Sequence, residues 1–192
     1  TRPATDYPMR TIKLTLAYDG TAYAGWQVQP DKPTVQGVLE RAVARVADHE
    51  ARVTACGRTD TGVHALCQVA HFDSTSKRAE RAWILGLNSH LPRSSSVVWI
   101  RAVSDDFHPP FSVFARTYRY RIANRWIRPA LEARYVSWYR KPLDAERIQP
   151  VAGVLRRRRL ADNVKSLRDH RVPVFLQPFR DSGDMVVQRG VG

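Results

Sequence analysis

The sequence predicts an α+β fold in which an antiparallel sheet carries helices on one face. Short runs of alternating apolar and polar residues are typical of strands with one buried face. Two longer stretches place their apolar residues at the spacing of an amphipathic helix. These segments follow one another as strand, helix, strand, strand, helix, strand, within a chain of 192 residues. That length suits one sizeable domain or two small ones.

The chain begins with a segment that we expect to be a loose tail, because residues 1–10 contain two prolines and show no periodicity. Residues 12–18 then alternate as a strand, which Asp19-Gly20 ends. The following loop, residues 21–32, carries Trp26. An exposed aromatic ring in a basic protein can stack on RNA bases, whereas the alternative is that Trp26 packs over the sheet.

The middle of the chain supplies the remaining elements of this first unit. Thr34 suits the N-cap of a helix whose apolar positions run from Val35 to Val46. Residues 52–56 and 68–72 are predicted strands, residues 79–87 a helix ended by Asn88, and residues 97–102 a fourth strand. This order corresponds to a ferredoxin-like βαββαβ unit, whose open sheet face is a common platform for RNA.

A second, incomplete unit of the same kind follows. Residues 103–114 are irregular, residues 117–122 and 137–139 read as strands, and residues 143–155 have helical spacing. We therefore divide the chain into a tail (1–10), a catalytic half-domain (11–112), a partial second half-domain (113–155) and a C-terminal tail (156–192). The last segment opens with four arginines and shows little amphipathic order, so we expect it to be disordered and interpret it as a truncated or altered remnant.

The charge composition indicates which classes of binding partner the protein is expected to have. The formal net charge is +13, from 31 Lys and Arg against 18 Asp and Glu. Such an excess favours a polyanion, RNA or DNA before an acidic membrane, although it also serves solubility alone. With two cysteines, no signal peptide and no apolar run near the length of a membrane span, the chain is expected to be a reduced, cytoplasmic protein without a membrane segment.

Gly57 and Gly62 bracket a short polar run that reads as a reactive loop. Within it, Asp60 is a carboxylate at a tight turn between two strands, and hence a candidate nucleophile or general base. The alternative is that Asp60 caps a turn and Arg58 is a solvated partner. No metal is expected, because Cys56, His64, Cys67 and His71 have no zinc-site spacing.

Residues 57–73, GRTDTGVHALCQVAHFD, resemble the signature loop of the tRNA pseudouridine synthase A family. Further pieces similar to that family occur in the same order, from residue 11 to residue 155. They are Tyr18-Asp19-Gly20, Tyr23, Gly25-Trp26-Gln27, Asp106-Phe107-His108, Arg116-x-Tyr118-Arg119-Tyr120, Arg128-Pro129-Ala130 and Leu143-Asp144-Ala145-Glu146-Arg147.

This resemblance implies a cofactor-free isomerase that converts uridine to pseudouridine in the tRNA anticodon stem-loop, at uridines 38, 39 and 40. It assigns Asp60 as the catalytic nucleophile and Tyr118 as the residue that stacks on the target base. Arg58, two residues from Asp60, is a candidate substrate-binding residue, because a guanidinium there would hold the carboxylate ionised and bind a flanking phosphate; the alternative is a weak surface ion pair. It also implies a homodimer that clasps tRNA. The RNA-binding segment is Phe107-His108-Pro109-Pro110-Phe111, where the family's usual Phe-His-Ala-Arg-Phe carries an arginine that is missing here.

Two other functions remain open on sequence grounds. The chain is alternatively a non-catalytic RNA-binding remnant of such an enzyme, either because much of the second half is missing or because the Asp60 site has decayed. A third hypothesis is an Asp-dependent hydrolase. Such an enzyme would need metal ligands or a second paired carboxylate, and we identify neither in the sequence.

Overall fold

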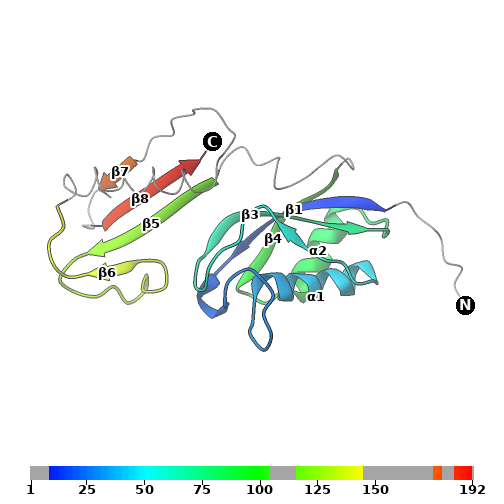
Figure 1. The fold of residues 1–192 in the computed structure, drawn as a ribbon, viewed down its shortest axis with the longest axis horizontal. Coiled ribbons are helices and arrows are strands. Elements are labelled where there is room, and N and C mark those ends of the chain that lie inside the picture. The colour runs from blue at the N-terminus through cyan, green and yellow to red at the C-terminus, as the bar shows by residue number, and fades with distance from the viewer. Residues whose placement is uncertain (1–8, 104–115, 145–174, 179–183, 192) are drawn as a thin grey trace, which may run out of the picture. The chain divides into compact units, whose positions relative to one another are not determined.

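The computed structural model describes residues 9–103, 116–144, 175–178 and 184–191. The chain divides into two compact units, Thr1–Val113 and Phe114–Gly192. The N-terminal unit contains one sheet and the helices α1 and α2, and the C-terminal unit contains a second sheet (Figure 1). Within the described ranges, neither helix is long and apolar enough to cross a membrane.

The sheet of the N-terminal unit is antiparallel throughout. It consists of β1 (Arg10–Tyr18), β2 (Thr54–Ala55), β3 (Ala65–Ser74) and β4 (Ser95–Val103), in the order β2-β3-β1-β4. The pairs β1/β3, β1/β4 and β2/β3 all run antiparallel. The predicted α+β fold, an antiparallel sheet combined with helices, is thereby confirmed.

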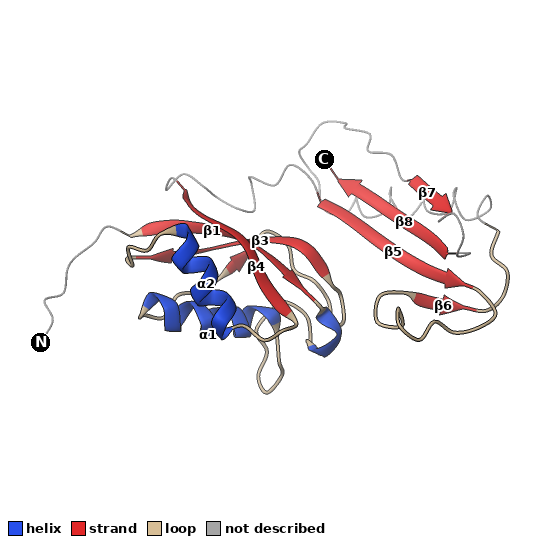
Figure 2. Cartoon of the chain, turned by 180° about the vertical axis from the view of Figure 1, so that it is seen from behind, coloured by secondary structure: helices blue, strands red, loops and turns tan. Residues whose placement is uncertain are grey.

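Both helices of this unit cover the same face of the sheet (Figure 2). The helix α1 (Val35–Ala47) begins as expected, because the Thr34 hydroxyl accepts a hydrogen bond from the Gly37 N–H at 3.3 Å. The helix α2 (Glu80–His90) continues past its predicted end at residue 87. Asn88 does not terminate it, because its side chain instead bonds both the N–H and the C=O of Val97, at 2.8 and 2.9 Å.

The core lies between the sheet and the helices. Trp26 is 2% exposed, and its ring centroid lies 6.3 Å from that of Tyr18. Trp26 therefore packs in the core, and its ring is not exposed for stacking on an RNA base. Phe72 of β3 meets Trp83 of α2 edge to face, with centroids 5.3 Å apart. The alternate residues of β1 complete this layer: Ile12, Leu14, Leu16 and Tyr18 are all buried.

The C-terminal unit contains β5 (Arg116–Asn124), β6 (Ser137–Tyr139), β7 (Phe175–Pro178) and β8 (Asp184–Val191), in the order β6-β5-β8-β7. The first two match predicted strands. The other two, β7 and β8, lie within residues 156–192, where the sequence shows little amphipathic order. The strand β8 pairs with β5 along its whole length. Hydrogen bonds and side-chain contacts to a neighbouring strand thus specify β8, although its own sequence has no amphipathic pattern. Most of the predicted helix 143–155 lies outside the described residues.

Candidate active site

The loop that carries Asp60 joins β2 to β3 and is closed at its base by two hydrogen bonds. The Cys56 N–H donates to the Val69 carbonyl at 2.9 Å, and the Gln68 side-chain amide donates to the Gly57 carbonyl. At the tip, the Val63 N–H donates back to the Asp60 carbonyl at 3.2 Å. With Gly62 at φ +78°, this is a turn that begins at Asp60 and needs glycine at its third position.

The segment that follows β1 fixes this loop on both sides of Asp60. The Trp26 N–H donates to the Thr59 carbonyl at 2.9 Å, and the Gly62 N–H donates to the Tyr23 carbonyl at 3.3 Å. Gly25 has φ +94°, and a Cβ built on it would lie 2.8 Å from the Thr59 carbonyl oxygen. The backbone of Asp60 is therefore held between two anchored neighbours, and a glycine is required where the segments touch.

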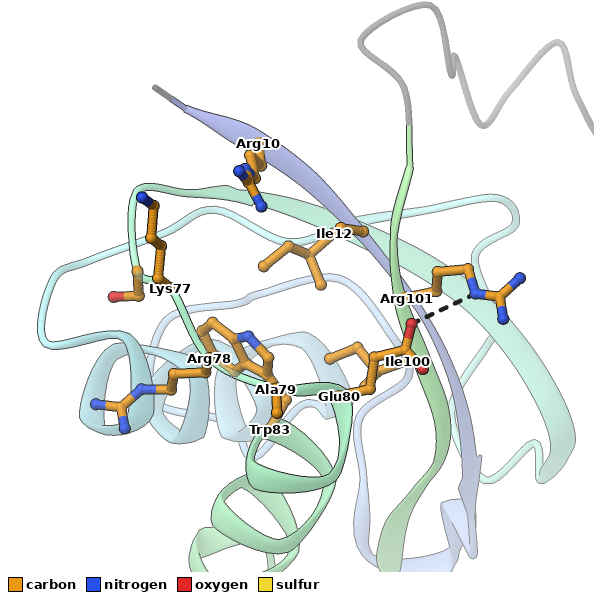
Figure 3. Close-up of a pocket in the computed structure, with 11 residues that line it drawn as sticks. Arg10, Ile12, Lys77, Arg78, Ala79, Glu80, Trp83, Ile100 and Arg101 are labelled. Carbon is orange, nitrogen blue, oxygen red and sulfur yellow. Dashed lines mark hydrogen bonds and ion pairs between the residues drawn. The ribbon is translucent and has the colours of Figure 1, made fainter. Parts of the chain in front are cut away.

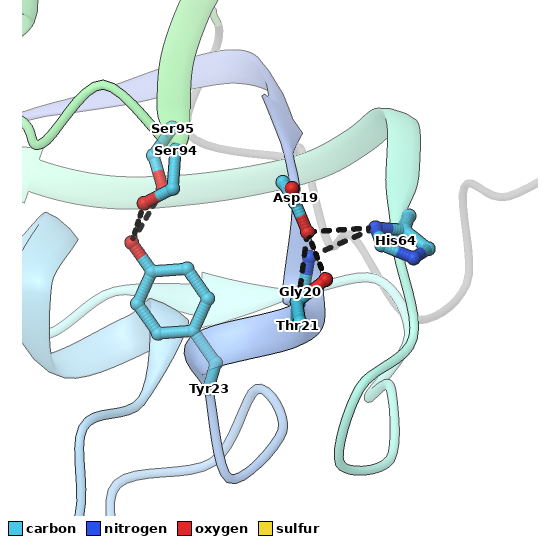
Figure 4. A network of polar contacts seen from close by, with 7 residues as sticks. All are labelled: Asp19, Gly20, Thr21, Tyr23, His64, Ser94 and Ser95. Carbon is cyan, nitrogen blue, oxygen red and sulfur yellow. Dashed lines mark hydrogen bonds and ion pairs between the residues drawn. The ribbon is translucent and has the colours of Figure 1, made fainter. Parts of the chain in front are cut away.

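A second close approach lies beyond the turn. A Cβ on Gly20 would lie 2.1 Å from the Val63 carbonyl oxygen, so only glycine fits there. Next to it, His64 Nδ1 lies 3.1 Å from both the Gly20 nitrogen and Asp19 Oδ1 (Figure 4). The ring accepts from the Gly20 N–H when Nδ1 is unprotonated and donates to Asp19 when it is protonated. His64 thus links the far end of the loop to the end of β1 in either state.

The hydroxyl of Tyr18 supports the loop at Thr59. The Tyr18 hydroxyl and Thr59 Oγ1 are 2.8 Å apart, and the tyrosine is 4% exposed. Burial raises the pKa of the Tyr18 phenol, and hydrogen bonds with Thr59 and Gln68 oppose that shift. At neutral pH the phenol is uncharged, so it acts here as a positional contact and not as an ion.

Tyr23 ties the same anchoring segment to the start of β4. Its hydroxyl lies 2.8 Å from Ser94 Oγ and 2.9 Å from Ser95 Oγ (Figure 4). The Asp19 N–H donates to the Ser94 carbonyl at 2.8 Å. The residues that hold the Asp60 loop are thus themselves bonded to the sheet.

Asp60 and Arg58 lie in the same loop, and both are exposed. Within the described part of the chain, no ion pair joins the guanidinium of Arg58 to the carboxylate of Asp60. Tyr118 lies in β5 of the C-terminal unit, opposite Arg189 of β8. The predicted RNA-binding segment, residues 107–111, lies outside the described residues.

Five residues that fix the loop had no predicted role in holding it: Tyr18, Gly20, Tyr23, Gly25 and His64. Their only signal was membership in the short pieces that carry the resemblance. Two glycines within a loop next to an apolar strand indicate close backbone approaches, although they do not identify the segment that approaches.

The described residues contain no group of three or more His, Cys, Asp or Glu side chains that could hold a metal ion. Cys56 is half-buried, Cys67 is exposed, and both are free thiols.

Comparison with known proteins gives concordant results. The sequence profile of a family described as tRNA pseudouridine synthase matches residues 15–112. The chain is 50% identical over 147 residues to tRNA pseudouridine synthase A of Coxiella burnetii (strain Dugway 5J108-111), covering 77% of this chain and 56% of the relative. The Methylococcus capsulatus protein of that name is 50% identical over 144 residues, covering 75% and 53%. That of Xylella fastidiosa (strain M23) is 49% identical over 148 residues, covering 77% and 58%. The chain thus spans about half the length of these curated relatives.

Proposed function

The chain belongs to the tRNA pseudouridine synthase family, and from this we propose that it isomerises uridine to pseudouridine in tRNA. The observation that carries the proposal is the presentation of Asp60: an exposed carboxylate on a turn whose backbone is anchored at Thr59 and Gly62. An exposed acid on a fixed turn can reach a nucleotide without moving the loop, which lowers the entropic cost of positioning it. Residues 11–112 form the catalytic half-domain in this proposal.

The proposed isomerisation rearranges bonds within one nucleotide. The bond from ribose C1′ to N1 of the base breaks, the base rotates, and C5 bonds to C1′. The proton leaves C5 and a proton is gained at N1, so no electrons are transferred and no cofactor is required. The Asp60 carboxylate acts either as a nucleophile at C1′ or as a base for the C2′ proton.

Arg58 and Tyr118 are the proposed substrate-binding residues. The Arg58 guanidinium, two residues from Asp60 and exposed, is suited to hold a phosphate flanking the target nucleotide. Tyr118 stacks on the target base in this proposal.

The proposed substrate is the anticodon stem-loop, at uridines 38, 39 and 40. A uridine in a stem must be extruded at a cost of a few kcal/mol, and residues 107–111 would contact the RNA there. The net charge of +13 supports binding of a phosphate backbone. We further propose a cytoplasmic homodimer, as the family resemblance implies.

A second candidate function is a non-catalytic RNA-binding remnant of such an enzyme. The specific observation in its favour is the missing arginine in the 107–111 segment, since a cation there would assist extrusion of the base.

The deciding experiment compares Asp60→Asn with Asp48→Asn. Each protein is incubated with unmodified tRNA, and pseudouridine is mapped chemically along the product. Asp48 lies exposed in the left-handed C-cap of α1 at φ 63°, where asparagine is well tolerated, so its variant controls for loss of a surface carboxylate. Product from the wild type and Asp48→Asn, but none from Asp60→Asn, supports the isomerase. Binding of tRNA without product in all three supports the remnant.

A further inference from the structure

A basic pocket lies at the end of the N-terminal sheet that is opposite to the Asp60 loop. Its volume is about 350 Å³, and it is bounded by the start of β1, the end of β4 and the residues leading into α2 (Figure 3). That volume is at the lower end of the range of about 300–1,000 Å³ that ligand sites occupy. The Asp60 chemistry described above uses none of its residues.

The lining combines an apolar floor with a cationic rim. Ile12, Trp83 and Ile100 form the floor and are 4%, 3% and 1% exposed. The rim carries the side chains of Arg10, Lys77, Arg78 and Arg101, and Glu80 is the one acid among the described residues that line it.

Glu80 by itself does not neutralise the four cationic side chains that the structure places in the rim. Glu80 Oε1 lies 3.4 Å from Arg101 Nε, and both side chains are more than half exposed. An exposed ion pair of this kind is weak and screened by salt. The lining residues within the described ranges therefore carry a formal charge of +3, from four cationic side chains and one carboxylate.

The location of the pocket separates it from the catalytic loop. Arg10 begins β1 and lines the pocket, whereas Tyr18 ends β1 and bonds to the Asp60 loop. The nine residues of β1 span roughly 26 Å at about 3.3 Å per residue. A ligand that touches both ends must therefore be a macromolecule, since a single nucleotide is far too short.

We propose that this pocket binds a phosphodiester segment of the RNA substrate at a distance from the target uridine. The cationic rim takes the phosphates, and the apolar floor receives the face of a sugar or base. Arginine suits this task because its planar fork matches phosphate oxygens. The inference rests on the proposed function, as it takes tRNA to be the ligand.

The first test measures tRNA affinity as a function of salt for the full chain and two triple variants. Arg10→Gln/Lys77→Gln/Arg78→Gln removes three rim charges. The control, Lys32→Gln/Arg45→Gln/Arg93→Gln, removes three exposed cations that do not line the pocket. Each lost phosphate contact should reduce the slope of log K against log salt by about 0.7–0.9, so the rim variant should lose about 2 in slope and bind tRNA roughly 10- to 100-fold more weakly. The control should lose less than about 1.

A second test needs no variant and so avoids any question of folding. Lysines are acetylated with and without tRNA, and modification is read by mass spectrometry. Lys77 in the rim should be protected by tRNA, whereas the exposed Lys32 should react equally in both samples. Unchanged reactivity of Lys77, or equal slopes for the two triple variants, overturns the inference.

The two proposals fail in distinguishable ways. If the wild type forms pseudouridine but the rim variant keeps the wild-type salt slope, the isomerase stands and the pocket is not an RNA site. If tRNA protects Lys77 but no pseudouridine appears, the pocket stands and the isomerase fails. If the wild type does not bind tRNA at all, both are overturned.

Discussion

The hydroxyl of Tyr18, at the end of β1, lies 2.8 Å from the hydroxyl of Thr59, the residue immediately before Asp60. The two residues are 41 positions apart in the chain. A buried core residue is thereby bonded directly to the loop that carries the proposed catalytic carboxylate. The same tyrosine contacts the core through Trp26, so the position of the loop is coupled to the packing of the sheet.

Tyr18→Phe tests this coupling, because it keeps the ring and removes only the hydroxyl. We expect the free energy of unfolding to fall by about 0.5–1.5 kcal/mol, the net value of one hydrogen bond. We also expect slower pseudouridine formation at saturating tRNA with little change in KM, because the loop is less well held while the binding surface is intact. Denaturant unfolding and steady-state kinetics measure the two effects. Tyr120→Phe, which removes an exposed hydroxyl bonded to Ser137, is the matched control.

The raised pKa of Tyr18 predicts how stability changes in alkali. In the unfolded chain the phenol has its ordinary pKa of about 10, and in the folded protein burial raises that pKa. Above about pH 10 the unfolded chain therefore loses a proton that the folded protein retains, and the free energy of unfolding declines. Below that pH the contribution is fully present.

Unfolding free energies measured from about pH 8 to pH 11 check this sign. The decline should be shallower in Tyr18→Phe than in the wild type. A Tyr18→Phe curve parallel to that of the wild type would contradict a perturbed phenol at this position.

Two glycines with positive φ provide a matched pair of substitutions. Gly25→Ala and Gly62→Ala both force alanine into a left-handed conformation, at a cost of about 1–2 kcal/mol. Only Gly25→Ala also places a Cβ 2.8 Å from the Thr59 carbonyl oxygen, whereas a Cβ on Gly62 meets no atom within 4 Å. Gly25→Ala should therefore be the more destabilising and should break the hydrogen bond from Trp26 to Thr59. Amide exchange at Trp26, together with denaturant unfolding, distinguishes the two variants.

Much of the N-terminal unit could be predicted because its elements are specified locally. The alternation over residues 12–18 identified β1, and Thr34 marked the start of α1 as a side-chain cap. The turn at Asp60 was also predictable, since Gly62 supplies the positive φ that such a turn needs.

The remaining features depend on partners that are distant in sequence. Nothing near Asn88 indicates that it bonds to Val97 and lets α2 continue. Likewise, β8 pairs with β5, whose residue Thr117 lies 73 positions before its partner Gly190. The anchors of the Asp60 loop are of the same kind. The periodic spacing of apolar residues identifies the buried face of a strand or helix, but it does not identify which loop packs against a given glycine.

The last prediction concerns Gln36 of α1. Its side chain forms a hydrogen bond with Val53, in the segment that leads into β2. Gln36 is 3% exposed, its amide donates to the Val53 carbonyl at 3.0 Å, and its side-chain oxygen accepts from the Val28 N–H at 3.1 Å. Glu40 completes the arrangement, since its carboxylate accepts from the Val53 N–H and from the Gln36 amide, each at 3.0 Å. The Gln36 and Glu40 side chains thus form hydrogen bonds with the backbone C=O and N–H of Val53, which lies just before β2.

Gln36→Leu should destabilise the protein by about 2–4 kcal/mol, because it leaves the buried Val53 carbonyl without a partner and also removes the part-buried hydrogen bond of the Val28 N–H. Glu40→Gln keeps an acceptor for the Val53 N–H and should cost less, about 1 kcal/mol. Denaturant unfolding of the two single variants and the double variant gives the coupling between the side chains, which should exceed about 0.5 kcal/mol because they share Val53. Faster amide exchange at Val28 in Gln36→Leu, but not in Glu40→Gln, would locate the loss at the Gln36 oxygen. Additive effects would instead mean that each side chain holds Val53 independently.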